Sequence, residues 1–232
     1  MATTPRIGLT ARSPHALTPY RRGIESTGGQ PVVLDPWLPR AELRRLYESL
    51  DGVLLPGGAG IAWVWHHHRR QNGASPHRES GWSDLDSADV QLARWALADS
   101  RPILGICRGI QMMALAVDGH LNRSVSGHQL NGAYPAHEIE IAPGSRLQDV
   151  LGCSRIPVNS RHYRAVRRLP PGSGLAVTAW SAKDGVVEGI EADGRTFALG
   201  VQFHPESLID FDEPSRRLFL WFVAACRRNG DW

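Results

Sequence analysis

The architecture of this chain is indicated by one stretch, Pro102-Ile-Leu-Gly-Ile-Cys-Arg-Gly-Ile-Gln111. An apolar strand over residues 102–106 runs directly into a helix expected from Arg108 to about Val117, with Cys107 at the turn. Glycines stand two residues before and two residues after this cysteine, where a tight strand-to-helix turn leaves no room for side chains. The pattern is the thiol counterpart of a nucleophile elbow, and it places Sγ at a helix N-terminus, which favours thiolate. Taken alone, it also fits an inert buried cysteine.

On both sides of this motif, short apolar runs alternate with longer amphipathic stretches. We expect strands over residues 6–10, 31–35, 51–56, 102–106, 138–142, 175–180, 186–191 and 196–203. We expect helices over residues 18–27, 40–50, 87–100, 108–117 and 214–227. Strands that alternate with helices of this length predict an α/β fold, with a mostly parallel central sheet covered by helices on both faces. No repeat, low-complexity segment or linker interrupts the pattern, so we expect one domain over residues 1–232.

Composition and charge are those of an ordinary soluble globular protein. The 232 residues are 42% hydrophobic and 21% charged, with a formal net charge of +3. Arginines occur in scattered pairs rather than on one basic face: Arg21-Arg22, Arg44-Arg45, Arg167-Arg168, Arg216-Arg217 and Arg227-Arg228. A nucleic-acid surface would cluster them, so we expect no nucleic-acid partner.

The sequence also indicates the cellular compartment of the protein. Its three cysteines are too few and too scattered for a disulfide scaffold, and the odd count suits a reducing compartment. The first residues carry no signal-peptide pattern, and no stretch approaches the ~20 apolar residues that span a bilayer. We therefore expect a cytoplasmic protein with no membrane partner. Dimers are common among soluble enzymes, so a homodimer is left open.

A second motif, Gly200-Val-Gln-Phe-His-Pro-Glu206, supplies a base for the cysteine. A strand ends in His204, and the rigid Pro205 fixes the relation between this imidazole and the carboxylate of Glu206. Such a carboxylate holds the imidazole in one tautomer while the other nitrogen faces the thiol. Cys107, His204 and Glu206 therefore form a candidate catalytic triad, although His204 alone would also fit a buried core histidine.

A third motif, Leu54-Leu-Pro-Gly-Gly58, ends a strand in adjacent glycines. Such a turn lets a backbone N–H approach a substrate closely. Together with the N–H of Arg108, which follows the nucleophile, it is expected to form an oxyanion hole. By itself, a Pro-Gly-Gly sequence is an ordinary loop.

In this order and spacing, the three motifs resemble the class I glutamine amidotransferase family. The resemblance runs from about Arg6 to Cys226 and implies a three-layer α/β fold, with a small antiparallel sheet in the C-terminal half. Within the family, the chain looks most like the γ-glutamyl-γ-aminobutyrate hydrolase branch. The stretches that carry this likeness are Arg108 in Gly105-Ile-Cys-Arg-Gly-Ile-Gln111, Val158-Asn-Ser-Arg-His162, residues 20–34, and His137 with Pro143-Gly-Ser-Arg-Leu147.

The resemblance implies roles for individual residues. Gly58 and Arg108 would supply the oxyanion amides, and Gln111 would contact the γ-glutamyl group. The segment with Asn159, Ser160, His162 and Tyr163 would border the substrate pocket.

Three departures from the branch bear on the substrate. Residues 59–68 replace an Asp-rich loop with Ala-Gly-Ile-Ala-Trp-Val-Trp-His-His-His, whose Trp63 and Trp65, with Trp82, either line the leaving-group side or pack as ordinary loop residues. Tyr163-Arg164 stands where a His-Gln or Gly-Gln pair is typical, and Arg164 either reads a carboxylate or is solvated. Asp118-Gly119 replaces a Gly-Gly pair at a helix end.

Three adjacent histidines cannot all point at one ion, and no cysteine or carboxylate follows residues 66–68 at ligand spacing. We therefore expect no metal and no cofactor. The resulting hypothesis is a cysteine hydrolase that cleaves a γ-glutamyl amide of a small molecule to glutamate and an amine, through a thioester. A glutaminase subunit that passes ammonia to a synthetase, and a non-catalytic binding module of the same fold, remain as alternatives.

Overall fold

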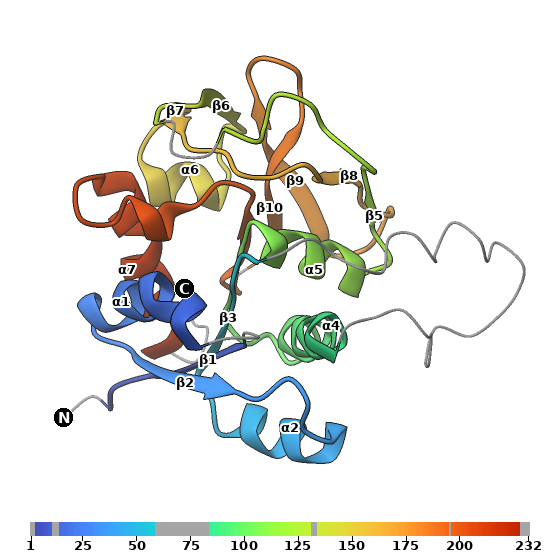
Figure 1. The fold of residues 1–232 in the computed structure, drawn as a ribbon, viewed down its shortest axis with the longest axis vertical. Coiled ribbons are helices and arrows are strands. Elements are labelled where there is room, and N and C mark those ends of the chain that lie inside the picture. The colour runs from blue at the N-terminus through green and yellow to red at the C-terminus, as the bar shows by residue number, and fades with distance from the viewer. Residues whose placement is uncertain (1–2, 11–13, 59–83, 131–133, 195, 228–232) are drawn as a thin grey trace, which may run out of the picture.

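The computed structural model describes residues 3–10, 14–58, 84–130, 134–194 and 196–227 (Figure 1). The predictions for Trp63, Trp65, Trp82 and the histidines at 66–68 lie outside this part of the chain. The described elements are β1 (Arg6–Thr10), η1 (Pro14–Leu17), α1 (Thr18–Ser26), β2 (Gln30–Leu34), α2 (Arg40–Glu48), β3 (Gly52–Leu55), α4 (Asp84–Ala98), β4 (Ile103–Ile106), α5 (Arg108–Ala116), β5 (His120–Leu121), β6 (His137–Ile141), α6 (Arg146–Leu151), β7 (Arg155–Val158), β8 (Val166–Arg168), β9 (Leu175–Ser181), β10 (Val187–Ala192), β11 (Ala198–Val201), η2 (Pro205–Ser207) and α7 (Glu213–Arg227).

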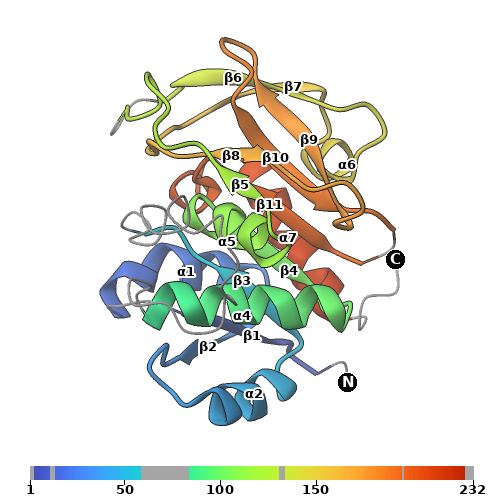
Figure 2. The same ribbon diagram turned by 90° about the vertical axis from the view of Figure 1, so that its right-hand side faces the viewer.

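The central sheet has nine strands in the order β2-β1-β3-β4-β11-β10-β9-β6-β7. The first five of these pair in parallel, and the remaining four continue the same sheet as antiparallel strands. Figure 2 shows β6, β7 and β9 at one end of the molecule and β2 with α2 at the other. A separate two-stranded antiparallel sheet joins β5 to β8.

Two hydrophobic cores, one on each face of the sheet, explain the three layers. Alternate residues of a strand point to opposite faces. Accordingly, Leu54 joins the core beneath α1 and α7, whereas Val53 and Leu55 join the core beneath α2, α4 and α5. Figure 1 shows α1 and α7 on one side of β1 and β3, with α4 and α5 on the other. Both faces of the parallel strands are therefore buried, as their continuous apolar runs require.

These observations confirm the predicted fold class, a mostly parallel sheet between helices with a small antiparallel sheet late in the chain. The sequence patterns missed α6 and the short strands β5, β7 and β8. Helix α6 is too short for a helical repeat, although Ser145 caps it by accepting a hydrogen bond from the Gln148 N–H at 3.1 Å. Strand β7 contains Pro157, which a strand tolerates at the edge of a sheet, where β7 lies.

Within the described chain, no helix combines the length and the apolar character that crossing a bilayer requires.

Candidate active site

Three neighbouring parallel strands end at one edge of the sheet and bring the sequence motifs together. β3 leads to Gly57, β4 leads to Cys107, and β11 leads through Gln202 to His204. Because β4 pairs with both β3 and β11, all three carboxyl ends lie side by side. This edge is where ligands bind in open α/β sheets.

Cys107 occupies a strained turn between β4 and α5. Its φ is 53° and its ψ is −97°, a conformation rare for a residue with a side chain. The flanking glycines permit the turn: a Cβ on Gly105 would lie 2.7 Å from the carbonyl carbon of Gly109, and one on Gly109 would lie 2.1 Å from the Leu55 oxygen. The predicted elbow geometry is therefore present.

This strain predicts a stability difference between two variants. A glycine at position 107 relieves a cost of about 1–3 kcal/mol, against about 0.5–1 kcal/mol of extra backbone entropy. We expect Cys107→Gly to be about 1 kcal/mol more stable than Cys107→Ala, which raises the melting temperature by about 2–4 °C in a chain of this size. Thermal unfolding of the two variants measures the difference. A glycine variant that melts at or below the alanine variant would contradict the strain.

His204 is paired with Glu206 as the sequence predicts. Nδ1 of His204 lies 2.7 Å from Oε1 of Glu206, and both side chains are buried. Burial by itself lowers the pKa of His204, but the negative charges of Cys107 and Glu206 outweigh it and raise that pKa to about 10. Nε2 has no hydrogen-bond partner in the described chain, so the nitrogen that is not turned to Glu206 is available for proton transfer.

Tyr20, on α1, reaches the same site and was missed by the sequence analysis. Its hydroxyl accepts a hydrogen bond from the Gly57 N–H at 3.0 Å. Burial, followed by the charges of Glu206 and Cys107, raises the pKa of Tyr20 well above its usual value, so the phenol stays protonated. Since Tyr20 occupies the Gly57 amide, the next amide, that of Gly58, is the one left to face a substrate.

The space beside these two glycines differs accordingly. A Cβ on Gly57 would lie 2.6 Å from the Tyr20 hydroxyl and 2.9 Å from Cε1 of His204. Among the described residues, a Cβ on Gly58 would meet only Cδ of Arg108, at 3.7 Å. Within this part of the chain, Gly58 is therefore less crowded than Gly57.

The side chain of Arg108 turns away from the substrate side into a buried ion pair. Its Nη2 lies 2.6 Å from Oδ1 of Asp86, and its Nη1 contacts Asp89, both on α4. Asp89 also accepts a hydrogen bond from the Thr10 hydroxyl. This network fixes the side chain of Arg108, the first residue of α5. The backbone N–H of Arg108 is then the group that this residue offers at the elbow.

Gln111, which lines the same pocket as Cys107, is held by its amide nitrogen. Nε2 donates to the Arg164 carbonyl at 2.9 Å and to Oε1 of Gln202 at 3.2 Å. Gln202 in turn donates from Nε2 to the Cys107 carbonyl at 3.3 Å. Gln202, two residues before His204, is a second contributor that the sequence analysis did not single out.

A pocket opens over Cys107 and gathers six of the predicted residues. Its lining consists of Gly58, Cys107, Arg108, Gln111, Arg161, His162, Tyr163 and Arg164. Two arginines, Arg161 and Arg164, contribute positive charge, which suits a substrate that carries carboxylates, although Nη2 of Arg161 also lies 3.4 Å from Oε1 of Glu206. Asn159 and Ser160 are absent from this lining.

Asn159 instead makes two hydrogen bonds to the backbone of His204. Its Nδ2 donates to the His204 carbonyl at 2.9 Å, and its Oδ1 accepts from the His204 N–H at 2.7 Å. The Ser160 hydroxyl donates to the His128 carbonyl at 2.8 Å. These contacts give both side chains buried partners within the protein, and the expectation that they bind substrate stays a prediction.

A variant at Asn159 distinguishes positioning from substrate binding. We expect Asn159→Ala to lower kcat about 10–100-fold while KM changes less than about threefold, because the variant loosens the base without removing a pocket contact. Steady-state kinetics measure both constants, and thermal unfolding checks that the variant is folded. A rise in KM at unchanged kcat would assign Asn159 to substrate binding instead.

Behind His162, the pocket wall is backed by more titratable side chains. His128, His137 and Glu188 complete a group with His162 in which the side-chain ligand atoms all lie within 4.8 Å of one another. The sequence predicts no metal, and these four residues stand too far apart in the chain to suggest one.

Comparison with known proteins places these features in a family. The sequence pattern of the family described as Peptidase C26 matches residues 8–206. The γ-glutamyl-γ-aminobutyrate hydrolase PuuD of Escherichia coli (strain K12) is 33% identical over 225 residues, which cover 90% of this chain and 85% of that protein. Protein NtpR of Enterococcus hirae is 30% identical over 217 residues, which cover 88% of this chain and 86% of that protein.

Solved structures show the same fold. The glutaminase domain of Trypanosoma brucei CTPS, with bound acivicin, matches with a TM-score of 0.69 at 17% identity. The match covers 99% of this chain and 96% of that chain. A glutamine amidotransferase from Thermotoga maritima matches with a TM-score of 0.62 at 17% identity, over 98% of this chain and 95% of that one.

Proposed function

This chain belongs to the Peptidase C26 family of glutamine amidotransferase-like hydrolases, and from that membership we propose that it hydrolyses a γ-glutamyl amide to glutamate and a free amine. The observation that carries the proposal is the meeting of Cys107, His204 and Gly58 at one sheet edge, beside a pocket with two arginines. The amine is of the γ-aminobutyrate kind, a small molecule with its own carboxylate.

The first half of the proposed reaction forms a thioester. The Cys107 thiolate attacks the γ-carbonyl carbon, and the backbone amides of Gly58 and Arg108 stabilise the oxyanion. The C–N bond then breaks as His204, protonated because its pKa is raised, gives its proton to the leaving amine. The γ-glutamyl group is now bound to Sγ of Cys107.

The second half releases glutamate. His204, now neutral, takes a proton from a water molecule, whose oxygen attacks the thioester carbonyl. The C–S bond breaks, and the thiolate and the imidazolium of His204 are restored. Gln111 is placed to contact the γ-glutamyl group, and Arg161 and Arg164 are placed to pair with carboxylates of the substrate.

Glutamate release from a panel of amides tests this proposal. The panel contains γ-glutamyl-γ-aminobutyrate, a γ-glutamyl amino acid, glutamine, and an α-glutamyl isomer as the matched control. We expect turnover of at least one γ-glutamyl amide and none of the α-isomer. Activity on glutamine alone, and only after a synthetase is added, would favour the glutaminase-subunit alternative; no release from any amide would favour the binding module.

A further inference from the structure

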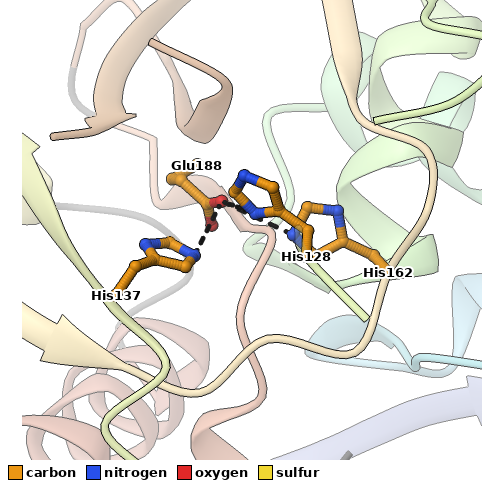
Figure 3. A group of neighbouring side chains, drawn as sticks. All are labelled: His128, His137, His162 and Glu188. Carbon is orange, nitrogen blue, oxygen red and sulfur yellow. Dashed lines mark ion pairs between the residues drawn. The ribbon is translucent and has the colours of Figure 1, made fainter. Parts of the chain in front are cut away.

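Four polar side chains from distant segments converge behind the pocket wall (Figure 3). His128 lies in the segment after β5, His137 begins β6, His162 follows β7, and Glu188 lies in β10. Figure 3 shows the three imidazole rings around the Glu188 carboxylate. All four side chains are buried, and Glu188 is 0% exposed.

The distances from the Glu188 carboxylate to the three imidazoles match those between ligand atoms of a tetrahedral metal site, and all the ligand atoms lie within 4.8 Å of one another. Oε1 of Glu188 lies 3.4 Å from Nδ1 of His128, 3.4 Å from Nε2 of His137 and 3.5 Å from Nε2 of His162. Zinc bound to nitrogen and oxygen at about 2.0–2.2 Å holds its ligand atoms about 3.3–3.5 Å apart. Charge-assisted hydrogen bonds between imidazolium and carboxylate are shorter, about 2.7–2.9 Å.

The outer nitrogens of the rings are anchored in the way that metal-bound histidines are. Nδ1 of His162 lies 3.0 Å from the Arg164 carbonyl, and Nδ1 of His137 lies 3.2 Å from the Glu138 carbonyl. A carbonyl oxygen only accepts, so each outer nitrogen carries a hydrogen, and the inner nitrogen is the one left to bind a metal through its lone pair.

His128 is anchored in the same manner, by a carboxylate. Its Nε2 lies 3.0 Å from Oδ2 of Asp184, whose side chain is 33% exposed. A carboxylate that orients a histidine whose other nitrogen faces the metal is a common support in zinc sites. The Nδ1 atom of His128 therefore faces the same centre as the other two rings.

Several polar atoms at the centre of this four-residue group lack hydrogen-bond partners among the described residues. Nε2 of His137, Nε2 of His162 and both carboxylate oxygens of Glu188 are buried without a hydrogen-bond partner among the described residues. His128 differs, since its Nδ1 also lies 3.4 Å from the Ser160 hydroxyl. Burial of polar and charged groups without a partner is costly. A divalent cation satisfies all of them, and its two positive charges balance Glu188 and Asp184.

We propose that His128, His137, His162 and Glu188 bind one Zn²⁺ ion as a closed structural site. Three imidazoles and one carboxylate in a tetrahedral arrangement are a zinc donor set, and four protein ligands leave no open position for catalysis. The ion would fix the segment 159–162, which supplies Asn159 to His204 and His162 to the pocket. This proposal departs from the expectation of no metal, and it does not depend on the proposed reaction.

Zinc content and affinity of the full chain, made without a polyhistidine tag, test the site. We expect about one Zn²⁺ per chain by plasma mass spectrometry, and stoichiometric rebinding after removal with a chelator. His137→Ala should weaken Zn²⁺ binding at least about 100-fold, and Asp184→Asn about 10–100-fold, measured by competition with a chromophoric chelator. Replacement by Co²⁺ should give the intense visible absorption of a tetrahedral site.

Two controls separate this cluster from other histidines. His120→Ala, at an exposed position in β5, should keep full zinc content. A variant with alanine at His66, His67 and His68 should also keep it, because the proposal assigns the metal to the four residues of the cluster alone. Loss of zinc in that triple variant would assign the metal to the adjacent histidines and overturn the proposal.

Two further results would overturn it. One is a folded wild-type chain that takes up no Zn²⁺ at micromolar concentrations, which would leave protons as the charges that balance Glu188. The other is unchanged affinity in Asp184→Asn, whose partly exposed side chain makes it the variant expected to fold even if His137→Ala does not.

Discussion

Replacing Cys107 with alanine is expected to reduce kcat for glutamate release by at least about 10⁴-fold, because the variant lacks the atom that forms the thioester. The oxyanion amides belong to the backbone, so the variant should keep substrate affinity while losing turnover. Steady-state assays measure the loss. Mass spectrometry of the wild type mixed rapidly with substrate should show a γ-glutamyl adduct that the variant lacks.

Cys153 provides the matched control for this experiment. It is partly buried, follows α6 and does not line the pocket over Cys107, and burial raises the pKa of its thiol. Cys153→Ala should therefore retain kcat within about twofold, as expected for a thiol outside the site. Activity of Cys107→Ala within about tenfold of the wild type would remove Cys107 from the mechanism and leave the binding-module alternative.

The fold and the core of the site were predictable from the sequence because both depend on local patterns and one rule of topology. Apolar runs marked β1, β3 and β4, and the glycines around Cys107 marked the elbow. In a parallel sheet, the carboxyl ends of strands share one edge, so motifs that each follow a strand must meet. Gly58, Cys107 and His204 satisfy this condition without any knowledge of their side-chain contacts.

The residues that the sequence did not identify act through side chains whose partners lie far away in the chain. Tyr20 reaches Gly57 from 37 positions away, and Asp89 on α4 binds the side chain of Arg108 on α5. No spacing rule marks such contacts, because they depend on how α1 and α4 pack against the sheet. The helix α6 is different, since its Ser145 and Gln148 form a cap pattern that the sequence displays.

The proposed zinc site shows most clearly that contacts between distant residues cannot be predicted from sequence spacing. His128, His137, His162 and Glu188 span 61 positions of sequence and no two have the short spacing of known zinc motifs. They meet because β6, β9 and β10 are neighbours in the antiparallel half of the sheet. In the sequence, the adjacent histidines at 66–68 are the conspicuous candidates for metal ligands. The geometry instead favours four residues whose wide spacing gives no sequence signal.

Replacing Glu206 with glutamine is expected to lower kcat about 10²–10⁴-fold while the fold is kept. Glutamine is nearly isosteric, but it removes the charge that holds Nδ1–H of His204 and stabilises the imidazolium. Kinetics against the wild type measure the loss. Glu25→Gln, in an exposed ion pair with Arg21, is the matched control and should leave kcat unchanged.

The pH dependence of the same variant identifies the cause of the loss. His204 must be protonated to release the amine, and its pKa is raised to about 10, so the wild-type kcat should fall only as pH rises through about 10. Without the Glu206 charge, that alkaline limb should move to lower pH.

The free energy of unfolding should depend on pH for the same reason. Because the folded-state pKa exceeds the ordinary value of about 6.5, the contribution of His204 is fully present below about pH 6.5 and is lost as pH rises through about 10. Denaturant unfolding should therefore show wild type and Glu206→Gln further apart at pH 6 than at pH 10. Equal separation at both values would mean that Glu206 acts through packing rather than through the charge of His204.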